Sequence, residues 1–128
     1  MKLERDLRRE ICRAALDQEA LIEAPAVFVL AAVYERTAAK YGRARAERYV
    51  HLEAGHAAQN LLLQAVSLGL GAVPIGAFDD DTLHRALGLP RDHRPVFPSA
   101  TRDRKRRRVS SRLWVRELSL SVRERRIR

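Results

Sequence analysis

The stretch from Arg48 to Pro90, RYVHLEAGHAAQNLLLQAVSLGLGAVPIGAFDDDTLHRALGLP, decides how this chain of 128 residues folds. Its first half belongs to a predicted helix over Ala44–Leu68, which contains no proline and Gly55 as its single glycine. Apolar residues recur there at helical spacing in two rows: Val50, Ala54, Ala57, Ala58, Leu61, Leu62, Ala65 and Leu68, and Leu52, Leu63, Val66 and Leu70. Because its second half is apolar on nearly every side, we expect a long central buried helix, enclosed by protein on all faces.

A Gly-Leu-Gly turn follows this helix. Gly69 suits a left-handed helix cap, and Gly71 lets the chain turn again. The run Ala72–Phe78 is predicted to be a short strand or an extended crossing. Gly76 inside that run indicates a place where the backbone approaches something closely.

A capped helix completes the stretch. The acidic run Asp79–Asp81 is predicted to begin a helix that reaches Leu87, with Gly88 closing it and Pro90 just beyond. Three aspartates could also suggest magnesium, but acidic residues at a helix start cap it and interact well with its dipole. We therefore interpret them as capping residues.

The N-terminal part predicts a helix, a strand and a second helix. The first helix is predicted to continue to about Ala20, and one of its faces is marked by Leu3, Leu7, Ile11, Ala14 and Ala15. Ala26–Ala32 is a continuous apolar run typical of a buried strand, and Tyr34–Tyr41 predicts a short helix before Gly42. The order of elements predicts one α+β or α/β domain.

Composition suits a soluble protein, with 46% hydrophobic residues. No apolar run is long enough to cross a membrane, and the charged start does not resemble a signal peptide. The single cysteine, Cys12, excludes an internal disulfide framework and suits the cytosol, so we expect a cytoplasmic protein. We interpret Cys12 as a small core residue rather than a nucleophile.

The net charge of +9 is concentrated near the C-terminus. Residues 1–90 carry 11 Lys and Arg against 12 Asp and Glu, whereas residues 91–128 carry 14 against 4. Such a change indicates either a nucleic-acid-binding arm, with Arg104–Arg108 as its densest part, or sequence that was never selected to fold. We divide the chain into residues 1–96 and a basic tail, 97–128. Arg102–Arg128 should be poorly packed or held by a partner, with one short strand possible over Leu113–Val122.

A metal site is not predicted. His51, Glu53 and His56 look like a ligand set, but the two histidines are five residues apart and point away from each other on a helix. This spacing lacks the four-residue separation of a zinc-binding helix.

The Arg48–Pro90 arrangement resembles the C-terminal half of the nitroreductase-like FMN flavoproteins, in particular the SagB-type dehydrogenase branch, over roughly Leu7–Val96. The resemblance implies a partial nitroreductase-like α+β domain. It also implies a homodimer in which the long helix is the main contact. FMN would be the cofactor, acting on a small-molecule substrate with NAD(P)H as the reductant.

The resemblance also implies a flavin-facing strand. Pro74 and Ile75 would pack on the ring, while the amides of Gly76 and Ala77 would face its polar edge. Many nitroreductases have Glu-Gly where this chain has Gly76 and Ala77, so only backbone contacts carry over there. The alternative is that VPIGAF is simply a core strand with a tolerated glycine.

Two parts of the family's site do not match, and both bind the FMN phosphate. An Arg-X-Ser-X-Arg element would precede Met1, and a Pro-X-Gly-X-Pro signature is replaced by Phe97–Arg102. With GC-rich codons, a shift of one base would restore that signature, so the tail can be interpreted as out-of-frame sequence. We therefore expect an FMN-dependent oxidoreductase fragment that is weak or inactive alone, with no catalytic residue identified. The alternative is a small basic protein that binds nucleic acid nonspecifically through its Arg-rich tail.

Overall fold

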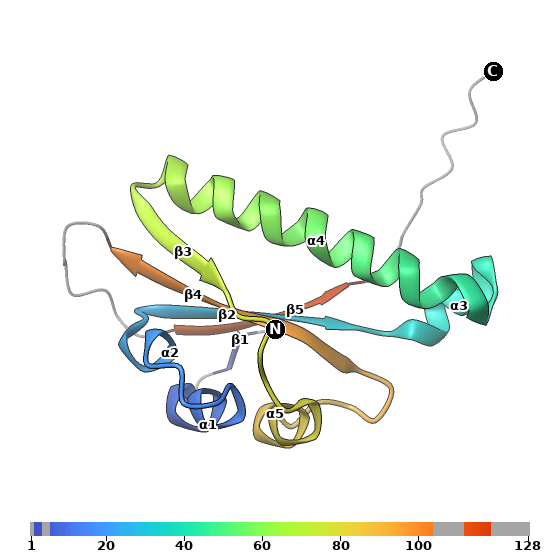
Figure 1. The fold of residues 1–128 in the computed structure, drawn as a ribbon, viewed down its shortest axis with the longest axis horizontal. Coiled ribbons are helices and arrows are strands. Elements are labelled where there is room, and N and C mark those ends of the chain that lie inside the picture. Colours follow the sequence, from blue (N-terminus) through green and yellow to red (C-terminus); the bar gives the residue numbers. More distant parts are fainter. Residues whose placement is uncertain (1, 4–5, 104–111, 119–128) are drawn as a thin grey trace.

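The computed structural model describes residues 2–3, 6–103 and 112–118. A five-stranded sheet with the order β1–β5–β2–β4–β3 forms its centre (Figure 1). The strands are β1 (Lys2–Leu3), β2 (Ala26–Ala32), β3 (Leu70–Pro74), β4 (Arg94–Asp103) and β5 (Arg112–Leu118). β2 and β5 are parallel, and the other neighbouring strands are antiparallel.

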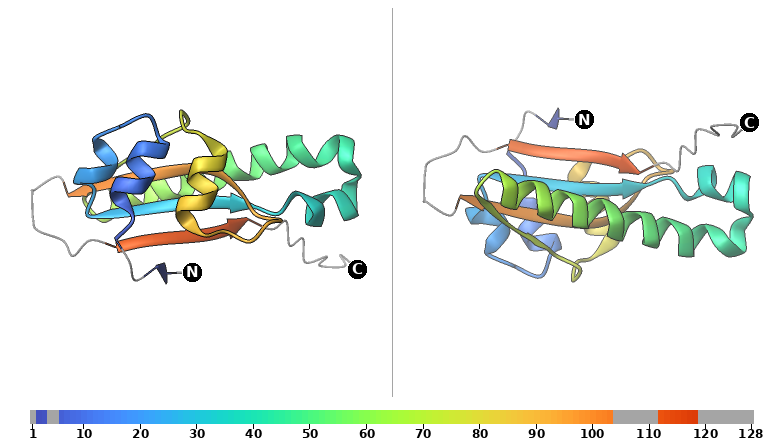
Figure 2. Two further views of the ribbon diagram at one scale, coloured as in Figure 1. Left: turned by 90° about the horizontal axis from the view of Figure 1, so that it is seen from below. Right: turned by 90° about the horizontal axis from the view of Figure 1, so that it is seen from above.

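Helices cover both faces of the sheet. They are α1 (Arg8–Ala14), α2 (Ala20–Glu23), α3 (Tyr34–Tyr41), α4 (Arg43–Ser67) and α5 (Asp80–Leu87). The long helix α4 crosses one face, while α1, α2 and α5 lie on the other (Figures 1 and 2). The predicted α+β class is confirmed.

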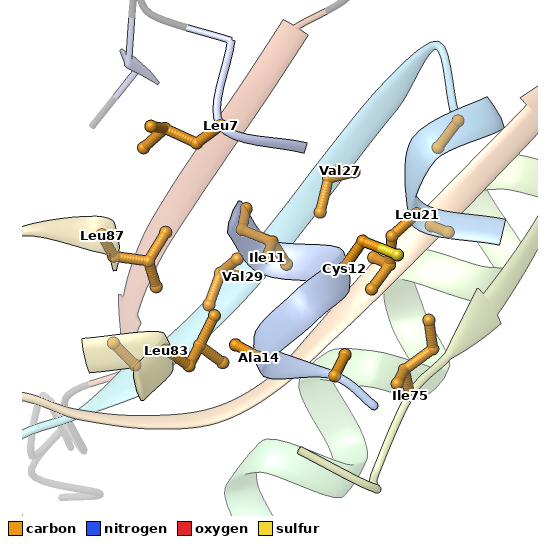
Figure 3. Close-up of a cluster of buried hydrophobic side chains, with 14 of the residues drawn as sticks. Leu7, Ile11, Cys12, Ala14, Leu21, Val27, Val29, Ile75, Leu83 and Leu87 are labelled. Atoms are coloured by element: carbon orange, nitrogen blue, oxygen red, sulfur yellow. The ribbon is translucent and has the colours of Figure 1, made fainter. Parts of the chain in front are cut away.

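Strand β2 separates two apolar layers because successive side chains of a strand point to opposite faces. Val27 and Val29 are fully buried in the larger cluster, between the sheet and the helices α1, α2 and α5 (Figure 3). Leu30 points the other way and packs with Ala54 and Ala58 of α4. The side on which α4 lies therefore has the smaller cluster of buried apolar residues.

The predicted long helix is confirmed within one residue at each end, and the other elements of the single chain leave part of it uncovered. Small residues, among them Ala54 and Ala58, are its buried positions. Leu63 and Val66 are 59% and 56% exposed. No described element lies over this outer row, which leaves a large apolar surface on the single chain.

The N-terminal helix is shorter than predicted. It ends at Ala14, because Leu16 and Asp17 have left-handed backbone angles, with φ of 54° and 58°. Residues with a side chain rarely adopt this conformation. The apolar pattern continued to Ala20, but the chain turns sharply before α2 begins there.

The helix α5 is confirmed together with both of its caps. The Asp79 carboxylate accepts a hydrogen bond of 2.7 Å from the amide of Thr82, and Gly88 has a left-handed φ of 61°. The preceding strand is shorter than predicted. It ends at Pro74, and residues 75–79 cross to α5 without regular structure.

The strand that the sequence allows within the tail is confirmed over residues 112–118. They form β5, which pairs in parallel with the whole of β2, from Ala26 beside Arg112 to Ala32 beside Leu118. β4 also continues through the predicted boundary at residue 96, as far as Asp103. The division at that boundary stays a prediction. Arg104–Arg108 and the part of the predicted strand beyond Leu118 lie outside the described residues.

Candidate functional site

The crossing from β3 to α5 is held at three points. The amide of Ile75 donates to the carbonyl of Pro98 at 2.9 Å, and the amide of Asp79 donates to the carbonyl of Ala14 at 2.8 Å. Between them, the side-chain amide of Gln18 donates to the carbonyl of Ala77 at 3.1 Å. The segment is thus fixed although it belongs to no helix or strand.

Gly76 and Ala77 are exposed in the middle of this crossing. Among residues 6–103, their amides have no hydrogen-bond acceptor. A Cβ atom added at Gly76 would meet nothing within 4 Å. Two adjacent exposed residues therefore carry backbone donors that have no acceptor among residues 6–103, an arrangement that can bind a polar edge or a developing negative charge.

The other two predicted flavin contacts differ in exposure. Pro74 is exposed beside Gly76. Ile75 is 3% exposed and lies in the cluster with Cys12 and Leu21 (Figure 3). The side chain of Ile75 thus packs beneath the crossing, in the core, while the exposed side of the crossing presents Pro74 and the two amides.

An open pocket of about 740 Å³ begins at Gly76 and Phe78. It lies between the start of α3, helix α4, helix α5 and the start of β4. Of the four predicted flavin contacts, Gly76 alone is in its lining. The polar residues of the lining are Tyr34, Glu35, His51, Asp80, Asp81, His84, Arg91, Asp92 and Arg94.

Tyr34 and His51 form a pair on the pocket wall. The Tyr34 hydroxyl lies 3.2 Å from Nε2 of His51. Burial raises the pKa of Tyr34, and the carboxylates of Glu47 and Asp80 raise it further. The phenol consequently stays protonated at neutral pH and can donate a hydrogen bond.

Several of the pocket's charged groups already have partners. Nε2 of His84 lies 2.9 Å from the carbonyl of Pro90. Asp92 pairs with Nδ1 of His93 at 2.9 Å, and this contact lowers the pKa of Asp92. These bonds order the loop between α5 and β4 that forms one rim of the pocket.

Cys12 is not built as a nucleophile. It is buried, and its thiol donates to the carbonyl of Gln18 at 3.4 Å. Burial raises its pKa, with smaller contributions from Asp17 and Glu19. A raised pKa disfavours the reactive thiolate, so Cys12 is a core residue.

Arg8 of α1 is held within the fold rather than directed toward a phosphate site. Its guanidinium bonds both oxygens of Asp6, at 2.9 and 2.7 Å. It also donates to the carbonyls of Ile22 and Ala24 at the end of α2. Arg8 thus ties α1 to α2. Arg5 lies outside the described residues.

His51, Glu53 and His56 do not converge on one point, since His51 is engaged with Tyr34. Among the described residues, no three His, Cys, Asp or Glu side chains are grouped so that they could hold a metal ion. No helix in the same part of the chain is long and apolar enough to cross a membrane.

Sequence reasoning missed the pocket. The sequence pattern indicated His51 only as a candidate metal ligand and Asp80 and Asp81 as capping residues. It indicated no functional role for Tyr34. The pocket residues come from separate elements and have no common spacing, so no local pattern could have grouped them. The role of Gln18 was missed for the same reason, since its partner Ala77 is 59 residues away.

Comparison with known proteins agrees with this fold. Residues 2–100 match the model of the nitroreductase family, so the chain belongs to that family. A Methanocaldococcus jannaschii protein described as "Putative nitroreductase MJ1384" is 48% identical over 87 residues, which is 68% of this chain and 43% of that protein.

Solved structures give the same family likeness. The NADPH:FMN oxidoreductase of Vibrio harveyi, solved in complex with NAD+, is 25% identical with a TM-score of 0.68, over 80% of this chain and 48% of that one. A "putative nitroreductase" of Anabaena variabilis is 31% identical with a TM-score of 0.64, over 77% and 20%. The chain thus spans less than half the length of each of these proteins.

Proposed function

We propose that this chain forms the flavin-ring half of an FMN-dependent oxidoreductase site of the SagB-type dehydrogenase branch. The observation that carries this proposal is the pair of exposed amides at Gly76 and Ala77, which have no acceptor among residues 6–103. FMN would supply hydride transfer, accepting a hydride from a reductant such as NAD(P)H and passing it to a small-molecule substrate.

The residues of the crossing fit the ring of FMN. Two fixed amides can donate to its polar edge without reorganisation. Pro74 offers an exposed apolar surface beside them, and the missing side chain at Gly76 leaves room for a close approach. The buried side chain of Ile75 supports the crossing from below.

The pocket beyond Gly76 and Phe78 is the proposed approach path for the substrate. Its wall carries the Tyr34 phenol, a neutral donor that the raised pKa keeps protonated. A hydroxyl beside the reacting groups can orient a polar substrate through a hydrogen bond. The charged lining carries both signs, so the pocket suits a substrate with polar groups.

Among the described residues, the phosphate of FMN has no matching anchor. Arg8 is engaged with Asp6 and α2, and Phe97–Arg102 stands where the resemblance places a Pro-X-Gly-X-Pro signature. Each charge-assisted contact is worth about 1.5–3 kcal/mol, so losing two of them weakens binding by roughly 10²-fold or more. Weak activity of the chain alone follows from this.

Self-association through α4 completes the proposal. Leu52, Leu63, Val66 and Leu68 are each more than half exposed. Leu52, Leu63 and Val66 belong to α4, whose outer side is uncovered by any described element (Figure 2). An apolar surface of this kind is typical of a subunit interface, so we propose a homodimer. The single, buried cysteine fits a reducing cytoplasmic compartment.

Titration of FMN fluorescence tests the ring site. Gly76→Leu fills the space above the two amides, and the added side chain meets no protein atom at its Cβ, so the fold should persist. It should weaken FMN at least about tenfold, which corresponds to 1.4 kcal/mol. Ala39→Leu places a leucine at an exposed position of α3 and is the control. Equal FMN affinity of Gly76→Leu and wild type would contradict the proposed site.

A further inference from the structure

The turn between α1 and α2 is strained and is bonded to the crossing. Leu16 and Asp17 both have left-handed φ values, 54° and 58°, although neither is glycine. Such a conformation persists only where surrounding contacts enforce it, and it often marks a functional position. Leu16 is exposed, so burial of its side chain does not explain the turn.

The strained turn brings Gln18 against the crossing. The Gln18 side-chain amide donates at 3.1 Å to the carbonyl of Ala15 and at 3.1 Å to that of Ala77. The backbone carbonyl of Gln18 accepts a hydrogen bond from the thiol of Cys12 at 3.4 Å. Gln18 is thus fixed from both ends, with its last donor directed at the peptide that follows Gly76 and Ala77.

The crossing has three attachment points, and Gln18 is the one made by a side chain. Backbone amides make the other two, at Ile75 and Asp79. The peptide units between these points carry the two exposed donors. Without the bond to Ala77, residues 76–78 have no hydrogen bond to the rest of residues 6–103.

We propose that Gln18 is a positioning residue, which fixes the direction of the Gly76 and Ala77 amides through the carbonyl of Ala77. This inference rests on the proposed function, because those amides are the proposed donors to the flavin ring. Donors that are held in place before binding give tighter and more selective binding than donors that must be ordered on binding. The strained turn at Leu16 and Asp17 is what brings Gln18 into contact with Ala77.

Backbone ¹⁵N order parameters of the protein without FMN test the positioning. In the wild type, the order parameters of Gly76 and Ala77 should be ~0.85, and in Gln18→Ala they should fall to ~0.6. Gln18→Glu keeps the shape but, when ionised, cannot donate, so it should behave alike at pH 7. Gln64→Ala, at an exposed position of α4 outside the row of Leu52, Leu63 and Val66, is the matched control and should change nothing.

Val27 and Val29 in the core serve as internal references. Loss of order there as well would show that Gln18 supports the whole fold and would overturn the inference. Unchanged order at Gly76 and Ala77 in both variants would overturn it too. Lowering the pH below the ordinary pKa of glutamate gives Gln18→Glu a proton to donate, so order at these two residues should return relative to wild type.

FMN affinity is the second readout. Gln18→Ala and Gln18→Glu should bind FMN about tenfold more weakly at pH 7. Unchanged affinity in both variants would overturn the positioning role. If the wild type itself binds no flavin, the proposed function fails, while the order parameters still decide whether Gln18 positions the crossing.

Discussion

The hydroxyl of Tyr34 and Nε2 of His51 lie 3.2 Å apart, and their rings meet edge to face at 79°. This pair joins the start of α3 to α4 at the wall of the pocket. Tyr34→Phe keeps the ring and removes the hydrogen bond. The free energy of unfolding should fall by about 0.5–1.5 kcal/mol in urea titrations. Tyr41→Phe, which has no such bond among the described residues, is the control. Equal losses in both variants would contradict a specific contribution from Tyr34.

The raised pKa of Tyr34 also predicts a pH dependence. The folded chain holds the phenolic proton to a higher pH than the unfolded chain does, because of burial, Glu47 and Asp80. Its contribution to stability is therefore complete below about pH 10, the ordinary tyrosine pKa, and declines as the pH rises through and above it. Thermal midpoints between pH 8 and pH 11, expressed relative to Tyr34→Phe, measure this decline. A difference between the thermal midpoints of wild type and Tyr34→Phe that stays constant with pH would contradict the predicted decline.

Asp79 caps α5 and should show the opposite pH dependence. The hydrogen bond from Thr82 lowers the pKa of Asp79, so its stabilising effect is present above the ordinary aspartate pKa and is lost as the pH falls through the lowered one. Asp79→Ala should lower the thermal midpoint by about 5 °C at pH 7. Asp81→Ala, two residues further along the chain, should lower the thermal midpoint less. An equal effect of the two substitutions would argue against capping by Asp79.

Leu83 anchors α5 on the sheet, since it is fully buried beside Val29 in the larger core cluster (Figure 3). Leu83→Ala should cost about 2–5 kcal/mol of unfolding free energy, because it leaves a cavity as well as removing apolar contacts. Leu16→Ala deletes the same atoms at a position that is 69% exposed. It should change stability little, and chemical denaturation of both variants makes the comparison. A small loss for Leu83→Ala would show that α5 is not held by this core.

The outer row of α4 predicts self-association. Leu63→Glu should shift sedimentation toward a monomer at micromolar concentration, because a charge would be placed in the apolar interface. Gln64→Glu adds the same charge at the neighbouring exposed position and should affect assembly less. A wild-type chain that sediments as a stable monomer would contradict the homodimer.

Elements with strong local signals were predictable from the sequence. The apolar rows and Gly69 gave α4 within a residue, and Asp79 and Gly88 gave both caps of α5. The turn at Leu16 and Asp17 was not predictable, because nothing local stops the helix there and the contact between Gln18 and Ala77 is distant in sequence. The burial of Ile75 was missed since a family resemblance locates a segment without orienting each side chain.

The pairing of β5 was partly predictable. Alternating residues indicated a strand after Leu113, but the surrounding arginines favoured an unpacked tail. β5 pairs with β2 in spite of these arginines, because an unpaired edge of β2 would leave its amides and carbonyls without partners. The candidate site was predicted as a segment, residues 74–77. Its three attachment points and the pocket beside it required the tertiary structure.

The proposed function gives this chain a site for the flavin ring without a matching anchor for the phosphate among the described residues. Parallel titrations with FMN and with riboflavin, which lacks the phosphate, distinguish these two contributions. We expect weak binding of both, with dissociation constants within about threefold of each other, because the phosphate contributes no charge-assisted contact. FMN bound roughly 10²-fold more tightly than riboflavin would show a phosphate anchor elsewhere, and binding of neither would contradict the ring site at Gly76 and Ala77.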